Sequence, residues 1–342
     1  MSDQVGFRTP RVLLPQPHVN LKKWAVIACD QYTAEPDYWR DVASAVGDAP
    51  STLNMIFPEA YLESPDAPTR IAQIQASMKR ALAEGLLREH EGAVYVERTV
   101  GGHVRCGLML ELDLEHYDFS STSQSLVRPT EGTIVARLAP RIAVREHAAL
   151  ELPHILVLID DPACTVIEPI AAARSTLTPL YSTELMMGGG HVAGFAVGDA
   201  LAEQATRTLN ALASPAAFAA RYGVAPGTPV MLFAVGDGNH SLATAKAIWE
   251  RNKSSVGLGH PSRWALVEIE NIHDSALQFE PIHRLLFGVR GDIRRHWQKL
   301  LAATSPALKC PPLAQCASAW RRRMGPRTRW GWWGRARVSA WL

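Results

Sequence analysis

In Met231-Leu-Phe-Ala-Val-Gly-Asp-Gly-Asn-His-Ser-Leu-Ala-Thr-Ala-Lys-Ala-Ile-Trp-Glu250, a short apolar run passes into a polar loop and then into a helical pattern. The run 231–235 is typical of a buried strand, and 242–250 carries apolar residues at helical spacing. The loop 236–241 turns on two glycines. The first N–H groups of such a helix point at the mouth of the loop, which is how a strand-loop-helix unit holds a phosphate.

This loop has more polar chemistry than a plain connection needs. Ser241 or Asn239 alone would suffice to cap the helix. Asp237 and His240 add a carboxylate and an imidazole, which are groups that bind ligands or move protons. We therefore favour a functional loop over the alternative, an ordinary strand-to-helix turn whose polar residues serve only as caps.

Composition predicts a globular protein of one large or two modest domains. The chain has 342 residues, of which 47% are hydrophobic and 20% are charged. No apolar run is long enough to cross a bilayer, and the N-terminus lacks the apolar core of a signal peptide. Five cysteines without a Cys-x-x-Cys pair suggest neither a zinc site nor a disulfide framework. We expect a cytoplasmic protein that does not contact membranes.

Charge is divided unevenly along the chain. Eleven of the 35 basic residues and none of the 33 acidic residues lie beyond Asp292, so the preceding body is acidic and the tail strongly basic. Six of the ten tryptophans also lie in this tail. A basic, aromatic arm is typical of nucleic-acid binding, but a reading-frame error in a high-GC gene gives the same composition. We favour the second explanation and expect 291–342 to be disordered or frame-shifted. The acidic body argues against nucleic-acid binding.

Alternating patterns predict an α/β fold, with a mixed α+β arrangement as the alternative. The polar stretch 118–125 suggests a boundary between an N-terminal α/β lobe, 1–125, and a phosphate-loop lobe, 126–290. Strands are expected at 24–29, 154–159, 231–235 and 263–270, a β-hairpin at 92–99 and 105–114, and helices at 35–46, 67–87, 199–212, 215–222 and 242–250.

Three further polar groups are candidates for a site. Arg128 and Glu131 flank a proline-stiffened turn and suit an anion and a base, although a surface ion pair would look the same. Asp160 and Asp161 end an apolar strand and suit a magnesium ion held with a nucleotide phosphate, although a solvated turn is equally consistent. His283 and Arg284 form a third pair, and a single histidine in such a place is more often structural.

Five ordered motifs give the chain a family resemblance: Ala28-Cys-Asp-Gln-Tyr-Thr33, Arg128-Pro-Thr-Glu-Gly-Thr133, Leu158-Ile-Asp-Asp-Pro162, Gly236-Asp-Gly-Asn-His-Ser241 and Phe279-Glu-Pro-Ile-His-Arg284. On these motifs residues 10–290 resemble the bacterial and archaeal domain-of-unknown-function family 1015 (DUF1015), whose members usually continue with further folded chain after the last motif.

The resemblance also implies chemistry. Family members are often labelled as similar to ParB partition proteins, and the Asp-Gly-x-His loop is similar to phosphate loops of sulfiredoxin, of the ParB nucleotide site and of an archaeal ADP-dependent serine kinase. The kinase loop reads Asp-Gly-His-His-Arg, so Asn239 and Ser241 replace its first histidine and its arginine. Arg128 or Arg284 would then have to supply the positive charge. Family genes tend to lie beside serine-biosynthesis genes, which implies serine or phosphoserine as the substrate.

We therefore expect a phosphoryl-transfer enzyme acting between serine and phosphoserine, with a nucleotide or water as the other party. His240 would donate to the phosphate oxygens or act as an acid, and Arg128 would neutralise charge. Glu131 would be the base, and Asp237 would orient His240 or bind magnesium. The rivals are a ParB-like, nucleotide-gated DNA-binding protein and a metabolite-binding protein without turnover. A nucleotide, ADP, ATP or another, with Mg²⁺ is expected to contact Gly236, Gly238, Asn239, Ser241, His283 and Arg284. The substrate is expected to contact Asp30, Gln31 and Tyr32, and the metal Asp160 and Asp161.

Overall fold

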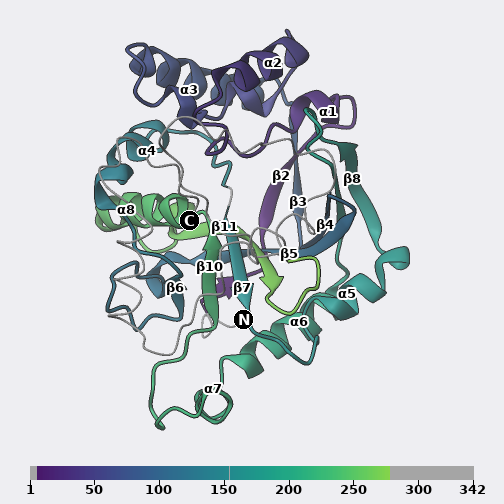
Figure 1. Ribbon diagram of the computed structural model, residues 1–342, viewed down its shortest axis with the longest axis vertical. Coiled ribbons are helices and arrows are strands. Elements are labelled where there is room, and N and C mark those ends of the chain that lie inside the picture. The colour runs from purple at the N-terminus through teal and green to yellow at the C-terminus, as the bar shows by residue number, and fades with distance from the viewer. Residues whose placement is uncertain (1–5, 154, 278–342) are drawn as a thin grey trace, which may run out of the picture. The chain divides into compact units, whose positions relative to one another are not determined.

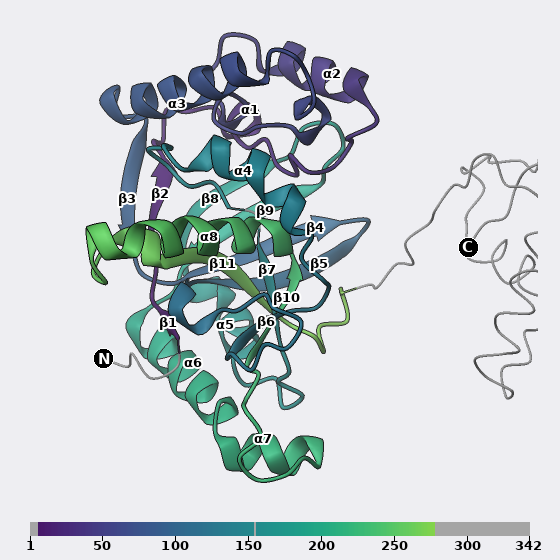
Figure 2. The same ribbon diagram turned by 90° about the vertical axis from the view of Figure 1, so that its left-hand side faces the viewer.

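The fold was analysed in a computed structural model that describes residues 6–153 and 155–277 (Figures 1 and 2). The strands are β1 (Phe7–Arg8), β2 (Arg11–Pro15), β3 (Leu87–Glu91), β4 (Val94–Val100), β5 (His103–Asp113), β6 (Val127–Pro129), β7 (Leu156–Ile159), β8 (Thr178–Glu184), β9 (His191–Ala196), β10 (Phe233–Asp237) and β11 (Trp264–Asn271). The α-helices are α1 (Leu21–Trp24), α2 (Pro36–Val46), α3 (Ala67–Ala83), α4 (Leu138–Arg145), α5 (Glu168–Ala172), α6 (Asp199–Leu212), α7 (Pro215–Tyr222) and α8 (Asn239–Val256).

One mixed sheet organises the described chain. Its strands follow the order β6-β10-β7-β11-β5-β4-β9-β8, and β1 pairs with β5. Strand β10 runs parallel to β6 and antiparallel to β7, and β11 runs parallel to β7. The other pairings are antiparallel, and β2 and β3 form a separate ribbon. The expected α/β class is therefore confirmed, in a sheet of mixed direction.

Helices on the two sides of the central strands share one apolar core. In Figure 1, α4 and α8 lie to one side of β10 and β7, and α5 and α6 lie to the other. Leu242 and Trp249 of α8, Ile170 of α5 and Leu209 of α6 belong to the same buried cluster as Val157 of β7. Burial of such large apolar side chains is the main driving force that holds these helices on the sheet.

The helices near the N-terminus have apolar clusters of their own. Trp24, Ile74 and Met78 pack with neighbours from α1, α3 and the chain between them, and Val144 of α4 joins this cluster. Trp39 of α2 packs in a second cluster with Val26, Val42 and Val46. Helix α4 is therefore in contact with the N-terminal helices as well as with α8.

The expected boundary near residue 125 does not separate two sheets. Strand β5, from the first expected lobe, pairs with β11, from the second. The described residues on both sides of this boundary belong to one compact unit. The end of the second expected lobe and the tail 291–342 lie outside the described residues.

Most of the expected elements are present, with three local differences. The expected strand 24–29 is wrong: Asn20 caps α1 by accepting a hydrogen bond from the Lys23 N–H at 3.2 Å, and the chain after Trp24 is irregular. Helix α4 and the β8–β9 hairpin were not predicted. The glycine-rich stretch 188–190 is the turn of that hairpin, and the Leu185 N–H donates to the Gly190 carbonyl at 2.7 Å.

Within the described residues, no helix combines the length and the apolar character needed to cross a bilayer.

Trp249 offers a direct test of how α8 is held. Its side chain is fully buried, and its Nε1–H donates to Glu115 Oε1 at 2.6 Å. We expect Trp249→Ala to lower the free energy of unfolding by about 3–5 kcal/mol, because it removes a large buried ring. Arg251→Ala, on the exposed side of the same helix, should change it by less than about 0.5 kcal/mol. Urea unfolding measures both values, and equal values would contradict this packing.

Candidate functional site

Helix α8 begins without a capping side chain. Gly238 stands at its N-cap with φ 77° and ψ 24°, a left-handed conformation that glycine adopts without strain. Asp237 Oδ1 accepts from the Gly238 N–H at 2.7 Å, and no described side chain caps the helix. The expected cap by Ser241 or Asn239 is therefore wrong. The N–H groups of the first turn stay available to an anion.

Two buried polar atoms close to this turn have no hydrogen-bond partner among the described residues. The first is Oδ1 of Asn239, whose residue is only 4% exposed, and the second is Oγ1 of Thr133 in the loop after β6. Leaving a buried acceptor or hydroxyl unsatisfied costs about 1–3 kcal/mol. Such atoms are usually satisfied by a bound water or ligand.

His240 is held as a neutral imidazole. The backbone N–H of Ile134 donates to its Nε2 at 3.3 Å, so that nitrogen is the acceptor and Nδ1 carries the proton. Burial lowers the pKa of His240, and the nearby cations Arg141 and Arg137 lower it further, while Glu131 opposes them. Nδ1 is therefore a hydrogen-bond donor beside two arginines.

Those arginines come from α4, an element that was not predicted. Arg137 stands at the N-cap of α4, and Arg141 and Arg145 follow at intervals of four residues, so the three share one face of the helix. Leu138 and Ile142 of α4 pack on Ala243 and Ile248 of α8, which brings this face to the start of α8. The four-residue repeat of arginines was the sequence signal for these cations.

Two of the three arginines have fixed partners. Arg141 pairs with Glu59, and the pKa of Glu59 is raised by burial against the opposing effect of Arg141. Arg145 donates from Nη1 to the carbonyl of Ser241 at 2.8 Å and to its Oγ at 3.2 Å, and its Nη2 lies 2.8 Å from Glu151 Oε2. Arg145 thus links α4 to the first turn of α8.

Strand direction brings Glu131, and not Arg128, to this turn. Because β6 and β10 are parallel, Arg128 lies opposite Ala234, and Glu131 follows at the same end as Asp237. Thr130 Oγ1 donates to the Val235 carbonyl at 2.6 Å and ties the two strand ends together. The Arg128 guanidinium instead donates to the carbonyls of Ser125, Pro229 and Val230, at 2.7, 2.9 and 3.2 Å, which precede the two strands.

Asp160 and Asp161 lie at the other edge of the sheet. Because β7 runs antiparallel to β10, the end of β7 is opposite the beginning of β10. Asp161 is buried and accepts from the Val166 N–H at 2.9 Å, and Asp160 Oδ1 lies 2.7 Å from His273 Nε2. In the described part of the chain, no group of three or more histidine, cysteine or acidic side chains could hold a metal ion.

The first motif lies beside the Arg141–Glu59 pair. The Glu59 N–H donates to the Cys29 carbonyl at 2.7 Å, and the charge of Asp30 contributes to the raised pKa of Glu59. Asp30, Gln31 and Tyr32 are exposed. Burial raises the pKa of the Cys29 thiol to about 12, so this cysteine is not a thiolate nucleophile at neutral pH. His283 and Arg284 lie outside the described residues.

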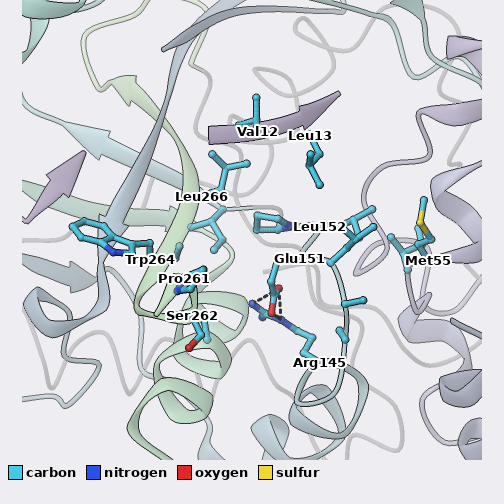
Figure 3. A pocket seen from close by; sticks show the side chains of 18 of the residues that line it. Val12, Leu13, Met55, Arg145, Glu151, Leu152, Pro261, Ser262, Trp264 and Leu266 are labelled. Carbon is cyan, nitrogen blue, oxygen red and sulfur yellow. Dashed lines mark hydrogen bonds and ion pairs between the residues drawn. The ribbon is translucent and has the colours of Figure 1, made fainter. Parts of the chain in front are cut away.

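A cavity of about 750 Å³ lies next to this site but does not contain it. Val12, Leu152, Trp264 and Leu266 line it, and Arg145 faces Glu151 in its wall (Figure 3). His240, Glu131 and Asp237 are not among its lining residues. Because Arg145 is paired with Glu151, and Arg8 with Glu111, these walls offer matched charges and suit a phosphate poorly.

The environment of His240 predicts a measurable titration. We expect its imidazole to titrate below the usual value of 6.5, because burial and two cations disfavour its charged form. As pH falls through the usual value, the unfolded chain binds a proton that the folded site does not, so this histidine lowers stability in acid. Arg141→Gln should raise the pKa of His240, whereas Arg251→Gln, far along α8, should not. NMR of the imidazole Cε1–H measures both, and an unchanged pKa in Arg141→Gln would contradict the assigned geometry.

Comparison with known proteins places the chain in a family. No curated protein and no solved structure matches it. A family model described as "Protein of unknown function (DUF1015)" matches residues 12–319. The match continues past residue 290, where the resemblance was expected to end, and takes in part of the basic tail. The chain therefore belongs to the DUF1015 family.

Proposed function

We propose that the β10–α8 loop binds the phosphate of a small molecule and that the protein transfers a phosphoryl group between serine and phosphoserine, with a nucleotide or water as the other party. The observation that carries the proposal is the uncapped first turn of α8 beside His240, Arg137 and Arg141. Helix N–H groups and arginines together are a common way of binding phosphate. The choice of serine rests on the implied kinase likeness and gene neighbourhood alone.

Each side chain has a role that follows from its chemistry. The N–H groups of Asn239, His240 and Ser241 bind phosphate oxygens, and Nδ1 of His240 donates to one of them. Arg137 and Arg141 neutralise the charge that spreads over the oxygens during transfer, in place of Arg128. Glu131 is the proposed base on the serine hydroxyl or on water, because it lies close enough to oppose the lowered pKa of His240.

A nucleotide and Mg²⁺ are part of this proposal. Mg²⁺ in phosphoryl-transfer sites is usually held by one or two carboxylates together with substrate phosphates, so it needs no all-protein cage. Asp237 is the carboxylate at the loop that fits this arrangement, because Glu131 is the proposed base. The ion would supply charge neutralisation at the phosphate oxygens.

Turnover of variants tests the roles. We expect His240→Ala and Arg141→Ala each to lower kcat by about 100- to 1000-fold, because each removes a donor to the transferring group. Arg128→Ala should act mainly on folding and lower the free energy of unfolding by about 1–3 kcal/mol, since it removes the hydrogen bonds that a charged guanidinium donates to three main-chain carbonyls. Phosphorus NMR of phosphoserine formation and hydrolysis measures turnover. Two results would contradict these roles: an unchanged kcat in His240→Ala, or a loss of kcat in Arg128→Ala as large as that in Arg141→Ala.

Ligand binding tests the substrate class separately from turnover. Ligand at about a hundredfold its dissociation constant adds roughly 2.7 kcal/mol of stability, which a thermal-shift assay detects. We expect the full chain to be stabilised by phosphoserine and by ADP or ATP with Mg²⁺, and His240→Ala to lose most of this shift. A shift with CTP alone would favour the ParB-like alternative, and a shift with phosphoserine without turnover would favour a binding protein.

A further inference from the structure

Three aromatic rings, those of Tyr32, Tyr38 and Trp39, contact one another in a row, which we call the aromatic column. Tyr32 stacks on Tyr38 with ring centroids 3.8 Å apart and planes 12° apart, and Tyr38 meets Trp39 edge-on at 5.2 Å. Trp39 is only 2% exposed and is part of the core cluster of α2, whereas Tyr32 is 39% exposed. The column is therefore anchored in the core and ends in a ring whose outer face is open.

The backbone presents this ring in an unusual conformation. Tyr32 has φ 53°, and Ala28, at the other end of the same loop, has φ 58°. Residues other than glycine rarely adopt this left-handed region, and such positions cluster at ligand sites. The strained loop carries Asp30 and Gln31 between these two positions.

A chain of contacts connects the aromatic column with the proposed phosphate site. The loop carbonyl of Cys29 accepts from the Glu59 N–H at 2.7 Å, and Glu59 pairs with Arg141. Arg141 in turn is one of the two cations that lower the pKa of His240. A ligand that combines a flat aromatic ring with phosphate groups would suit the open ring face and the cationic turn together.

We infer that the outer face of Tyr32 is a stacking site for the base of a nucleoside phosphate whose phosphates lie at the α8 turn. The inference rests on the proposed function and makes it more specific, because it selects a nucleotide rather than water as the second reactant. A base stacked on an aromatic side chain typically contributes a 5- to 150-fold gain in affinity, roughly 1–3 kcal/mol by alanine substitution.

Calorimetric titration of the full chain with ADP and with inorganic pyrophosphate, which lacks the base, separates the two parts. We expect Tyr32→Ala to weaken ADP binding by about 5- to 150-fold and pyrophosphate binding by less than twofold, and Tyr32→Phe to bind both like the unmodified chain. Tyr222→Ala is the matched control, because Tyr222 is also exposed but bonds Asp160 at the far edge of the sheet. Melting curves show that the variants are folded.

The outcomes separate this inference from the proposed function. If pyrophosphate binds and Tyr32→Ala leaves the affinity for ADP unchanged, the stacking site is overturned and the phosphate site stands. Equal losses for ADP and pyrophosphate in Tyr32→Ala also overturn it, because the ring would then support the loop and not the base. A full chain that binds phosphoserine but neither ADP nor pyrophosphate overturns the stacking site alone, and a chain that binds none of the three overturns both.

Discussion

Strand β10 runs parallel to β6 and antiparallel to β7, and this pairing decides which side chains meet at the beginning of α8. A parallel neighbour ends at the same edge of the sheet, so the loop after β6 arrives beside the loop after β10. An antiparallel neighbour ends at the opposite edge, so the acidic pair after β7 is removed from it. The direction in which the strands pair therefore determines, more than any single side chain does, which residues lie together at the candidate site.

Electrostatics then shape what the selected side chains can do. The start of α8, Arg137 and Arg141 place positive charge around the half-buried His240, while Glu59 pairs with Arg141 and Glu131 opposes the two arginines. A neutral imidazole tolerates that surrounding better than an imidazolium does. Burial lowers the pKa of His240 most, and the two arginines lower it further, so the protonation state of this histidine depends on packing and on charge together.

The sequence predicted helices and strands better than it predicted which side chains contact one another in the fold. The β4–β5 hairpin, α6 and α7 follow from alternation, helical spacing and capping signals that lie within each segment. The central strand-loop-helix was also predictable, and so were His240 and Asp237 as its polar side chains. Arg128 was chosen for its charge next to Glu131, but two of its three acceptors, Pro229 and Val230, lie about a hundred residues away in the chain before β10. Such non-local bonds depend on strand order and direction, which no short motif encodes.

The run 24–29 was apolar enough for a strand, yet a local cap and the neighbouring helices determined its conformation.

Arg145 connects the first turn of α8 with the wall of the neighbouring cavity. One guanidinium reaches the main chain of Ser241 in the first turn of α8 and Glu151 in the wall of the apolar cavity. A guanidinium is planar and rigid, so its two sets of bonds share one orientation. The segment 146–153 and the first turn of α8 are therefore braced against each other, so the direction of the N–H groups at the start of α8 depends on residues in the wall of the neighbouring cavity.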